Sequence, residues 1–205
     1  MNITYLGSKC AIEHIFDKNY SYYSYYSGII DTQNLNLITT PLCGSSAPVD
    51  VVAEILNDPS LFLKTLRISS DTTWICQEHY KFVIHNFYKD RPKLIPPILQ
   101  MYFKRNFDLY KTIDIFIYCS LNFKNINQIF DILNACKKYN SNAKLLVFSN
   151  LNEFKENDVW NINSLSSILY SEKKIDSSEF LNFENVWYIS KKLISKIKSL
   201  DLSKF

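Results

Sequence analysis

Glycine is scarce in this sequence. Three glycines occur in 205 residues, whereas average usage of about 7% would give roughly 14. Gly7 follows "NITYL" and Gly44 follows "LNLITTPLC", so both come directly after a strand-like segment. At such positions a backbone turns sharply or approaches a ligand closely. The scarcity therefore directs attention to these two turns.

The sequence also lacks the features of several protein classes. No apolar run approaches the ~18 residues of a membrane-spanning helix, and "MNITYLGSKC" has no basic region followed by an apolar one, as a secretory signal would. The five cysteines are widely spaced with no CxxC pair, which disfavours a disulfide framework and a zinc site. The three histidines include no i, i+4 pair, so no metal site is predicted. We expect a cytoplasmic protein without a membrane span.

The sequence does contain enough apolar residues to form a core. Hydrophobic residues make up 47% of the chain and aromatic residues 15%, which can bury a substantial interior. The clearest unit begins with "TIDIFIYCSL" (112–121), a β-branched and aromatic run. It continues with 126–139, whose apolar residues keep one helical face, and with "AKLLVFSN" (143–150). This order predicts two parallel strands joined through a helix.

Other segments extend the alternation of strand and helix. Further strands are predicted at 3–6, 35–40, 72–77 and 185–190, and further helices at 10–17, 47–58, 95–106 and 191–200. Ser46 is the predicted N-cap of the second of these helices. The sequence therefore predicts a three-layer Rossmann-like α/β domain with a mostly parallel sheet of about five strands. Residues 1–150 would form this core domain, and 151–205 a polar connection, a strand and a helix packed on the same domain.

In parallel sheets of this kind, ligands bind outside the carboxyl ends of the strands, near the point where the strand order reverses. Two glycine–serine turns precede predicted helices, and their backbone N–H groups and helix dipoles favour a phosphate or carboxylate. The predicted anion-binding residues are Gly7, Ser8, Lys9, Gly44, Ser45 and Ser46. Polar residues further along the edge are Ser120, Asn122, Ser149, Asn150 and Asn152. The alternative is that Ser8 and Ser46 are ordinary helix caps and Lys9 is solvated. The identity of a cofactor stays open.

Four residues near the same edge are candidates for catalysis. Cys43 precedes a predicted helix, whose N-terminus favours a thiolate, and His79 or His14 would serve as its base. Glu78 and His79 follow a predicted strand and could act as general acid and base. Ser8 is a second candidate nucleophile. The alternatives to catalysis are that Cys43 is a small buried hydrophobic residue and that Glu78 and His79 lie in a surface turn.

Basic residues gather in 81–111, which holds seven Lys/Arg against two Asp/Glu, interleaved with aromatic residues. Such a segment suits an anionic partner, either nucleic acid or a phosphorylated substrate. The alternative is a pair of amphipathic helices with aromatic residues in the core and solvated lysines. Because the whole chain carries a net charge of only +3, we favour the alternative. We expect an anionic small molecule or nucleotide-containing substrate rather than nucleic acid.

Two stretches resemble motifs of known families. "YLGSK" followed by "CGSSAPV" resembles the first two cofactor motifs of adenine-specific DNA methyltransferases, which implies turns that hold S-adenosylmethionine. The catalytic (D/N)PP(Y/F) tetrapeptide of that family is absent from the sequence. "ITYLGSKCAIEHIF" looks like the opening strand, loop and helix of SGNH-type hydrolases of polysaccharide loci, which puts Ser8 at the nucleophile position. The late D-x-x-H block of that family is also absent, since no histidine follows His85. The chain is assigned to neither family.

These observations favour a small α/β enzyme, a transferase or hydrolase, that binds an anionic cofactor or substrate at the carboxyl edge of its sheet. The alternative is a non-catalytic α/β module that binds a small ligand or a protein, with its polar 151–180 stretch and aromatic surface used for recognition. Convergence of Ser8, Cys43 and His79 within hydrogen-bond reach would favour the enzyme.

Overall fold

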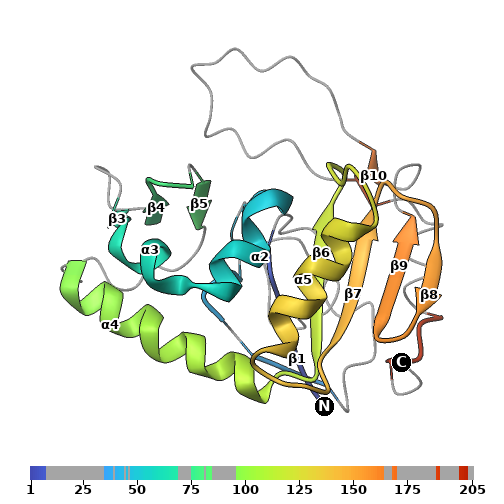
Figure 1. The fold of residues 1–205 in the computed structure, drawn as a ribbon, viewed down its shortest axis with the longest axis horizontal. Coiled ribbons are helices and arrows are strands. Elements are labelled where there is room, and N and C mark those ends of the chain that lie inside the picture. The colour runs from blue at the N-terminus through green and yellow to red at the C-terminus, as the bar shows by residue number, and fades with distance from the viewer. Residues whose placement is uncertain are drawn as a thin grey trace.

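A computed structural model describes residues 1–7, 35–38, 40–43, 45, 47–68, 75–80, 82–84, 96–163, 168–169, 188–189 and 199–202, and the structural statements below concern these residues. The largest sheet has six strands, in the order β2-β1-β6-β7-β9-β8 (Figure 1). The strands are β1 (Asn2–Tyr5), β2 (Asn36–Leu37), β6 (Ile115–Ser120), β7 (Lys144–Ser149), β8 (Phe154–Glu156) and β9 (Val159–Asn163).

Neighbouring strands in the series β2, β1, β6, β7 and β9 pair in parallel. Only β8 joins this sheet in the antiparallel direction. The predicted α/β class with a mostly parallel sheet is therefore confirmed. The hairpin from β8 to β9 was not predicted, since 151–180 was expected to be a polar connection. Its two-residue turn has Asn157 at a φ of 49°, a conformation that asparagine tolerates better than most residues.

The central strands of the sheet are buried on both faces, and β6 shows this most clearly because all six of its residues are buried, whereas the edge strand β8 has two exposed residues. Phe116 and Tyr118 face the core beneath the helices. Ile115, Ile117 and Cys119 alternate with them and belong to a second cluster on the opposite face. This alternation is the period of a strand, and a continuous apolar run is typical of parallel strands buried on both sides.

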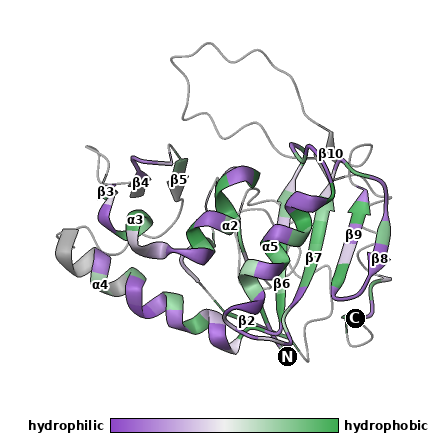
Figure 2. Cartoon of the chain, viewed as in Figure 1, coloured by the Kyte–Doolittle hydropathy of each residue, from purple (hydrophilic) through white to green (hydrophobic). Residues whose placement is uncertain are grey.

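Two helices cover the first face. They are α2 (Val49–Asn57) and α5 (Asn127–Lys137), which pack against each other. Figure 2 shows hydrophobic residues in β6 and β7, and both helices with mixed hydrophobic and hydrophilic residues along their lengths. On the second face, strand residues such as Phe148 pack with Leu200 and Leu202 from the far end of the chain.

The start of α2 differs from the prediction. Pro48, not Ser46, is the N-cap, with extended φ and ψ of −66° and 154° and no side-chain capping bond. Proline already has the φ that a helix start needs and has no N–H to satisfy, so it can end the extended segment without a serine cap. The predicted stop is confirmed, because α2 ends at Asn57 and Asp58 accepts a hydrogen bond from the Ser60 N–H at the start of the next helix.

A separate group of elements extends the core beyond α2. It comprises α3 (Pro59–Lys64), α4 (Pro96–Phe107), the 3-10 helix η2 (Asp108–Thr112) and a three-stranded antiparallel sheet of β3 (Leu66–Ile68), β4 (Ile75–Gln77) and β5 (Phe82–Ile84). The ring of Phe62 joins these elements, since it lies 6.2, 5.8 and 5.6 Å from the rings of Phe82, Phe103 and Phe107. The buried Phe103 and Phe107 agree with the expectation that aromatic residues of the basic segment belong to the core.

The segment 72–77 was predicted as a strand of the parallel sheet, and this placement is wrong. Its residues 75–77 form β4, which pairs antiparallel with β3 and β5. The short connections in this region favour antiparallel neighbours, because a parallel crossover needs a dozen residues or more.

The C-terminal strand prediction is confirmed in part. β11 (Tyr188–Ile189) pairs antiparallel with β10 (Ile168–Leu169) in a two-stranded sheet of its own. The helix predicted at 10–17 and most of that at 191–200 lie outside the described residues. The division at residue 150 stays a prediction. Among the helices of the described part, none has the length and apolar character needed to cross a membrane.

A buried glutamine, Gln77, connects α3 to the antiparallel sheet. Replacing it tests whether its hydrogen bonds stabilise the fold. The Gln77 side chain is 1% exposed. Its Nε2 donates to the Phe62 carbonyl (2.7 Å) and its Oε1 accepts from the Tyr80 N–H (3.0 Å). Gln77→Leu leaves these backbone groups unsatisfied, so we expect the free energy of unfolding to fall by about 1–3 kcal/mol, measured by urea denaturation.

The adjacent exposed residue is the control for this variant. Glu78→Gln removes only an exposed ion pair with Arg67 (3.5 Å), which is worth at most about 1 kcal/mol. Equal losses from the two variants would show that the Gln77 hydrogen bonds contribute nothing beyond an exposed contact.

The Tyr139 hydroxyl gives a prediction for alkaline pH. It donates to the Leu56 carbonyl of α2 (2.9 Å), and burial, followed by the nearby Cys136 and Asp108, raises the pKa of Tyr139 from 10.0 to about 12. The unfolded chain thus loses this proton at a lower pH than the folded chain, so its contribution to stability is complete below pH 10 and is lost as pH rises toward 12. Between these values, the free energy of unfolding should fall less steeply in Tyr139→Phe than in the wild type, by urea denaturation at several pH values. Identical slopes would contradict this.

Candidate functional site

The strand order locates one distinctive point on the sheet. β2 lies on one side of β1, and β6 lies on the other. The chain therefore goes from β1 to β2 and later returns to the opposite side of β1, so the strand order reverses between β1 and β6. In open parallel sheets, the crevice for ligands opens at this point, beyond the carboxyl ends of the strands.

Gly7 lies at this point of reversal. It follows β1, and its carbonyl accepts a hydrogen bond from the Cys119 N–H of β6 (3.5 Å). Its φ of +101° is in the region that residues with a side chain rarely adopt. A Cβ at this position would lie 2.4 Å from the Ser45 Oγ and 2.9 Å from the Ser45 carbonyl oxygen. Glycine is therefore required both by the backbone conformation and by the close approach of Ser45.

The contact between Gly7 and Ser45 joins two turns that the sequence singled out separately. Ser45 is 2% exposed, and its Oγ accepts a hydrogen bond from the Ala47 N–H (3.4 Å). Of the six predicted anion-binding residues, Gly7 and Ser45 are described and lie together. Ser8, Lys9, Gly44 and Ser46 lie outside the described residues.

Cys43 lies beside the same turns in a polar cluster. Its half-buried thiol is 3.3 Å from the Thr4 Oγ1, accepts from the Thr40 N–H (3.4 Å) and donates to the Tyr5 carbonyl (3.5 Å). The two threonine hydroxyls are 2.8 Å apart, and Thr4 donates to the Ile38 carbonyl (2.7 Å). The cluster thus fixes the segment after β2 against β1.

Tyr110 of η2 supports this cluster from the core. Its buried hydroxyl accepts a hydrogen bond from the Leu42 N–H (3.2 Å) and lies beside Thr40. Burial raises the pKa of Tyr110 well above its ordinary value, so the side chain is a neutral phenol at physiological pH. The sequence analysis did not identify Tyr110, because η2 and β2 are far apart in the chain and no local pattern connects them.

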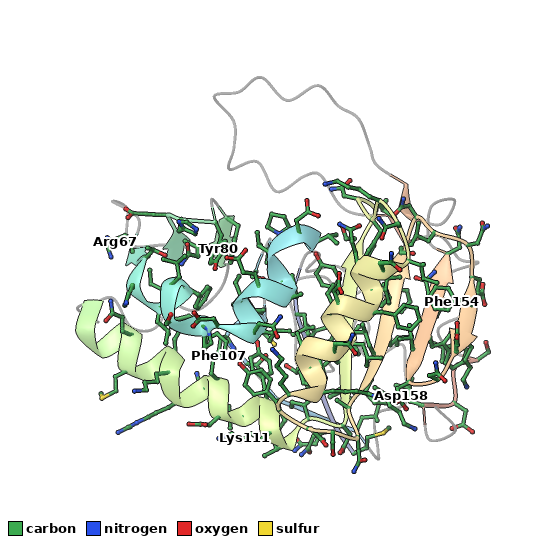
Figure 3. All side chains as sticks on the ribbon, viewed as in Figure 1. Arg67, Tyr80, Phe107, Lys111, Phe154 and Asp158 are labelled. Atoms are coloured by element: carbon green, nitrogen blue, oxygen red, sulfur yellow. The ribbon has the colours of Figure 1, made fainter. Side chains whose placement is uncertain are left out.

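Glu78 and His79 lie elsewhere. They follow β4 in the antiparallel sheet, so they are not at the carboxyl edge of the parallel sheet as expected. Both are exposed; Glu78 pairs with Arg67, and the His79 ring packs edge-on against Tyr80 at 4.8 Å. Figure 3 shows Arg67 and Tyr80 on the opposite side of α2 from Phe154 and Asp158. Glu78 and His79 therefore follow a strand of a different sheet from the one that carries the Gly7 turn.

The polar residues predicted along the rest of the edge hold loops together. Asn150 accepts from the Phe123 N–H (3.0 Å) and donates to the Phe123 carbonyl (2.9 Å). Ser149 accepts from the Leu151 N–H (3.0 Å) and donates to the buried Asn161 (2.7 Å). Similarly, the Ser120 hydroxyl accepts from the N–H of the exposed Asn122 (3.2 Å).

Asp50 lies in the first turn of α2. Its carboxylate binds the Lys124 Nζ (3.0 Å) and the Gln128 Nε2 (2.5 Å), both from the region where α5 begins. A carboxylate at this end of a helix complements the positive pole of the dipole. The Asp50 side chain thus joins the first turn of α2 to the start of α5, and Lys124 balances its negative charge.

The described residues include no group of three or more His, Cys, Asp or Glu side chains that could hold a metal ion. No protein-family model, curated protein or solved structure matches this chain. The functional argument therefore depends on the geometry of the site itself.

Replacing Gly7 tests the requirement for glycine. Gly7→Ala combines an unfavourable positive φ with a Cβ that collides with Ser45, so we expect the free energy of unfolding to fall by about 1–3 kcal/mol, measured by urea denaturation. Ser45→Ala leaves the Gly7 backbone unstrained and should cost less. A Gly7→Ala variant as stable as the wild type would mean that the turn needs no glycine.

Proposed function

We propose that this chain binds an anionic cofactor or substrate at the carboxyl edge of its parallel sheet, at the reversal between β1 and β6. The observation that carries the proposal is Gly7, whose positive φ makes a sharp turn at that point and brings Ser45 against its backbone. A sharp turn directly after the first strand, where the strand order reverses, is the position at which open parallel sheets bind ligands.

The chemistry of the sequence after this turn supports an anion. Ser8 supplies a hydroxyl and Lys9 a positive charge directly after Gly7. Backbone N–H groups in turns of this type, together with a lysine, commonly hold phosphate oxygens. We expect a phosphate- or nucleotide-containing small molecule.

We also propose the layered, Rossmann-like arrangement that the sequence predicted. The parallel strands run in the order β2-β1-β6-β7-β9, the doubly wound order in which a ligand site lies next to the first strand. The two separate core clusters, one on each face of the sheet, support layers on both sides.

Within this proposal, the chain is a transferase or hydrolase. Cys43 is the candidate nucleophile among the described residues near the turn, and Ser8 is the second. A base would come from the segment after β1, where the sequence carries His14, because Glu78 and His79 lie at the antiparallel sheet. The alternative is a non-catalytic module that binds the same ligand. The thiol contacts with two threonines are compatible with this alternative, since they hold the segment after β2 against β1 whether or not the thiol reacts.

Ligand binding is tested by thermal shift with nucleotides, S-adenosylmethionine, coenzyme A and nucleotide sugars at about 1 mM. A ligand that binds only the folded state must raise the melting temperature. We expect at least one phosphate-bearing compound to do so, with a smaller shift for Lys9→Ala. Lys64→Ala, which removes an exposed lysine of α3, should keep the wild-type shift. If no compound raises the melting temperature, the anion-binding proposal is wrong.

Catalysis is tested next with any compound that binds. Product formation is followed by mass spectrometry for the wild type, Cys43→Ala and Ser8→Ala. Turnover that disappears in one variant while its thermal shift is retained supports an enzyme with that residue as nucleophile. Binding without turnover in the wild type supports the non-catalytic module.

A further inference from the structure

An open hollow of about 320 Å³ lies beyond β7, between the start of α5 and the edge strand β8. It is lined by Ile126, Leu151, Asn152, Glu153, Phe154 and Glu156. Its volume is at the lower end of the range for small-ligand pockets. An open hollow of this size suits one or two side chains of a partner better than a whole cofactor.

The floor of the hollow is apolar. Ile126 is 40% exposed, one of three large hydrophobic side chains that are exposed in the described part of the chain. Phe154 comes from β8 (Figure 3) and packs on Phe130 of α5, with ring centroids 6.2 Å apart. Leu151 packs against the same core. An apolar floor that ends in an exposed isoleucine gains stability when another apolar side chain covers it.

The charged lining residues are all acidic. Glu153 and Glu156 line the hollow, and none of its six lining residues is basic. In contrast, the neighbouring Lys155 lies over the Trp160 ring, with its Nζ 4.4 Å from the ring centroid. The hollow thus combines apolar surface with negative charge and is complementary to an apolar group beside a cation.

The walls of the hollow are held in place by hydrogen bonds within the chain. The Asn161 side chain donates to the Asn152 carbonyl (2.8 Å), and Asn163 donates to the Leu151 carbonyl (2.9 Å). Asp158 in the turn between β8 and β9 forms an ion pair with Lys137 of α5. A preformed site loses less entropy when it binds than one that must first be ordered.

We propose that this hollow binds an extended segment of a partner protein that carries an apolar residue and, two positions away, a lysine or arginine. The spacing follows from β8, where Phe154 and Glu156 are two residues apart and so project to one face of the strand. β8 is also the outermost strand of the six-stranded sheet, where an extended segment can lie alongside. This proposal is independent of the anion site at the β1–β6 reversal.

The test uses three labelled peptides. The basic probe is acetyl-Ser-Leu-Ser-Arg-Ser-Leu-Ser, the acidic probe has Glu in place of Arg, and the polar probe has Ser in place of both Leu residues. Binding is measured by fluorescence anisotropy, and the contact region by amide chemical shifts of the ¹⁵N-labelled full chain. We expect the basic probe to bind most tightly and to shift the amides of residue 126 and of 151–156.

Two variants test the charge and the apolar floor. Glu156→Lys should weaken the basic probe by at least about threefold, since attraction becomes repulsion at an exposed site. Asp108→Lys makes the same charge change in η2, away from the hollow, and should bind as the wild type. Ile126→Ser removes the apolar side chain but leaves Asn125, which accepts hydrogen bonds from the Asn127 and Gln128 N–H groups at the start of α5, and should weaken both leucine-containing probes.

Melting temperatures near the wild-type value establish that each variant folds. The proposal is overturned if the basic probe shifts amides elsewhere or none at all. It is also overturned if Glu156→Lys and Asp108→Lys bind this probe equally, or if the acidic probe binds the wild type as tightly as the basic one.

Discussion

The burial of β6 on both faces is the constraint on which the rest of the described structure depends. A strand with all six residues buried needs hydrogen-bonded neighbours on both edges and apolar cover on both faces. β1 and β7 supply the edges in parallel, and α2 and α5 supply the cover on one face. Because these neighbours run in parallel, the carboxyl ends of the strands lie at one edge of the sheet. The turn at Gly7 lies at this edge.

The elements with a long, regular pattern could be predicted from the sequence. The unit from β6 through α5 to β7 combines an apolar strand, a helix with one apolar face and a second apolar strand, and each pattern has a single plausible period. The structure places all three within one to three residues of the predicted boundaries. Both faces of β6 and of β7 lie in the core. The fold class could therefore be identified without deciding which face of each strand is buried.

The short elements could not be placed in this way. β3, β4 and β5 have three residues each, which is too few to distinguish a parallel from an antiparallel neighbour. Their position was decided by tertiary packing around Phe62. For this reason Glu78 and His79 were assigned to the wrong sheet. The β8–β9 hairpin had a weak signal, because Asn157 and Asp158 separate a charged segment from "VWNIN", but polar neighbours on both sides concealed it.

The candidate site shows the same division between local and non-local information. The rarity of glycine identified Gly7 correctly as a special turn, because a positive φ is a local requirement. Its contact with Ser45 depends on β2 pairing beside β1, which no local pattern specifies. Once that pairing exists, the space that a Gly7 side chain would need is taken by Ser45. Strand order thus explains why this position requires a glycine in a chain with so few, and it links the backbone geometry of the turn to the location proposed for the ligand.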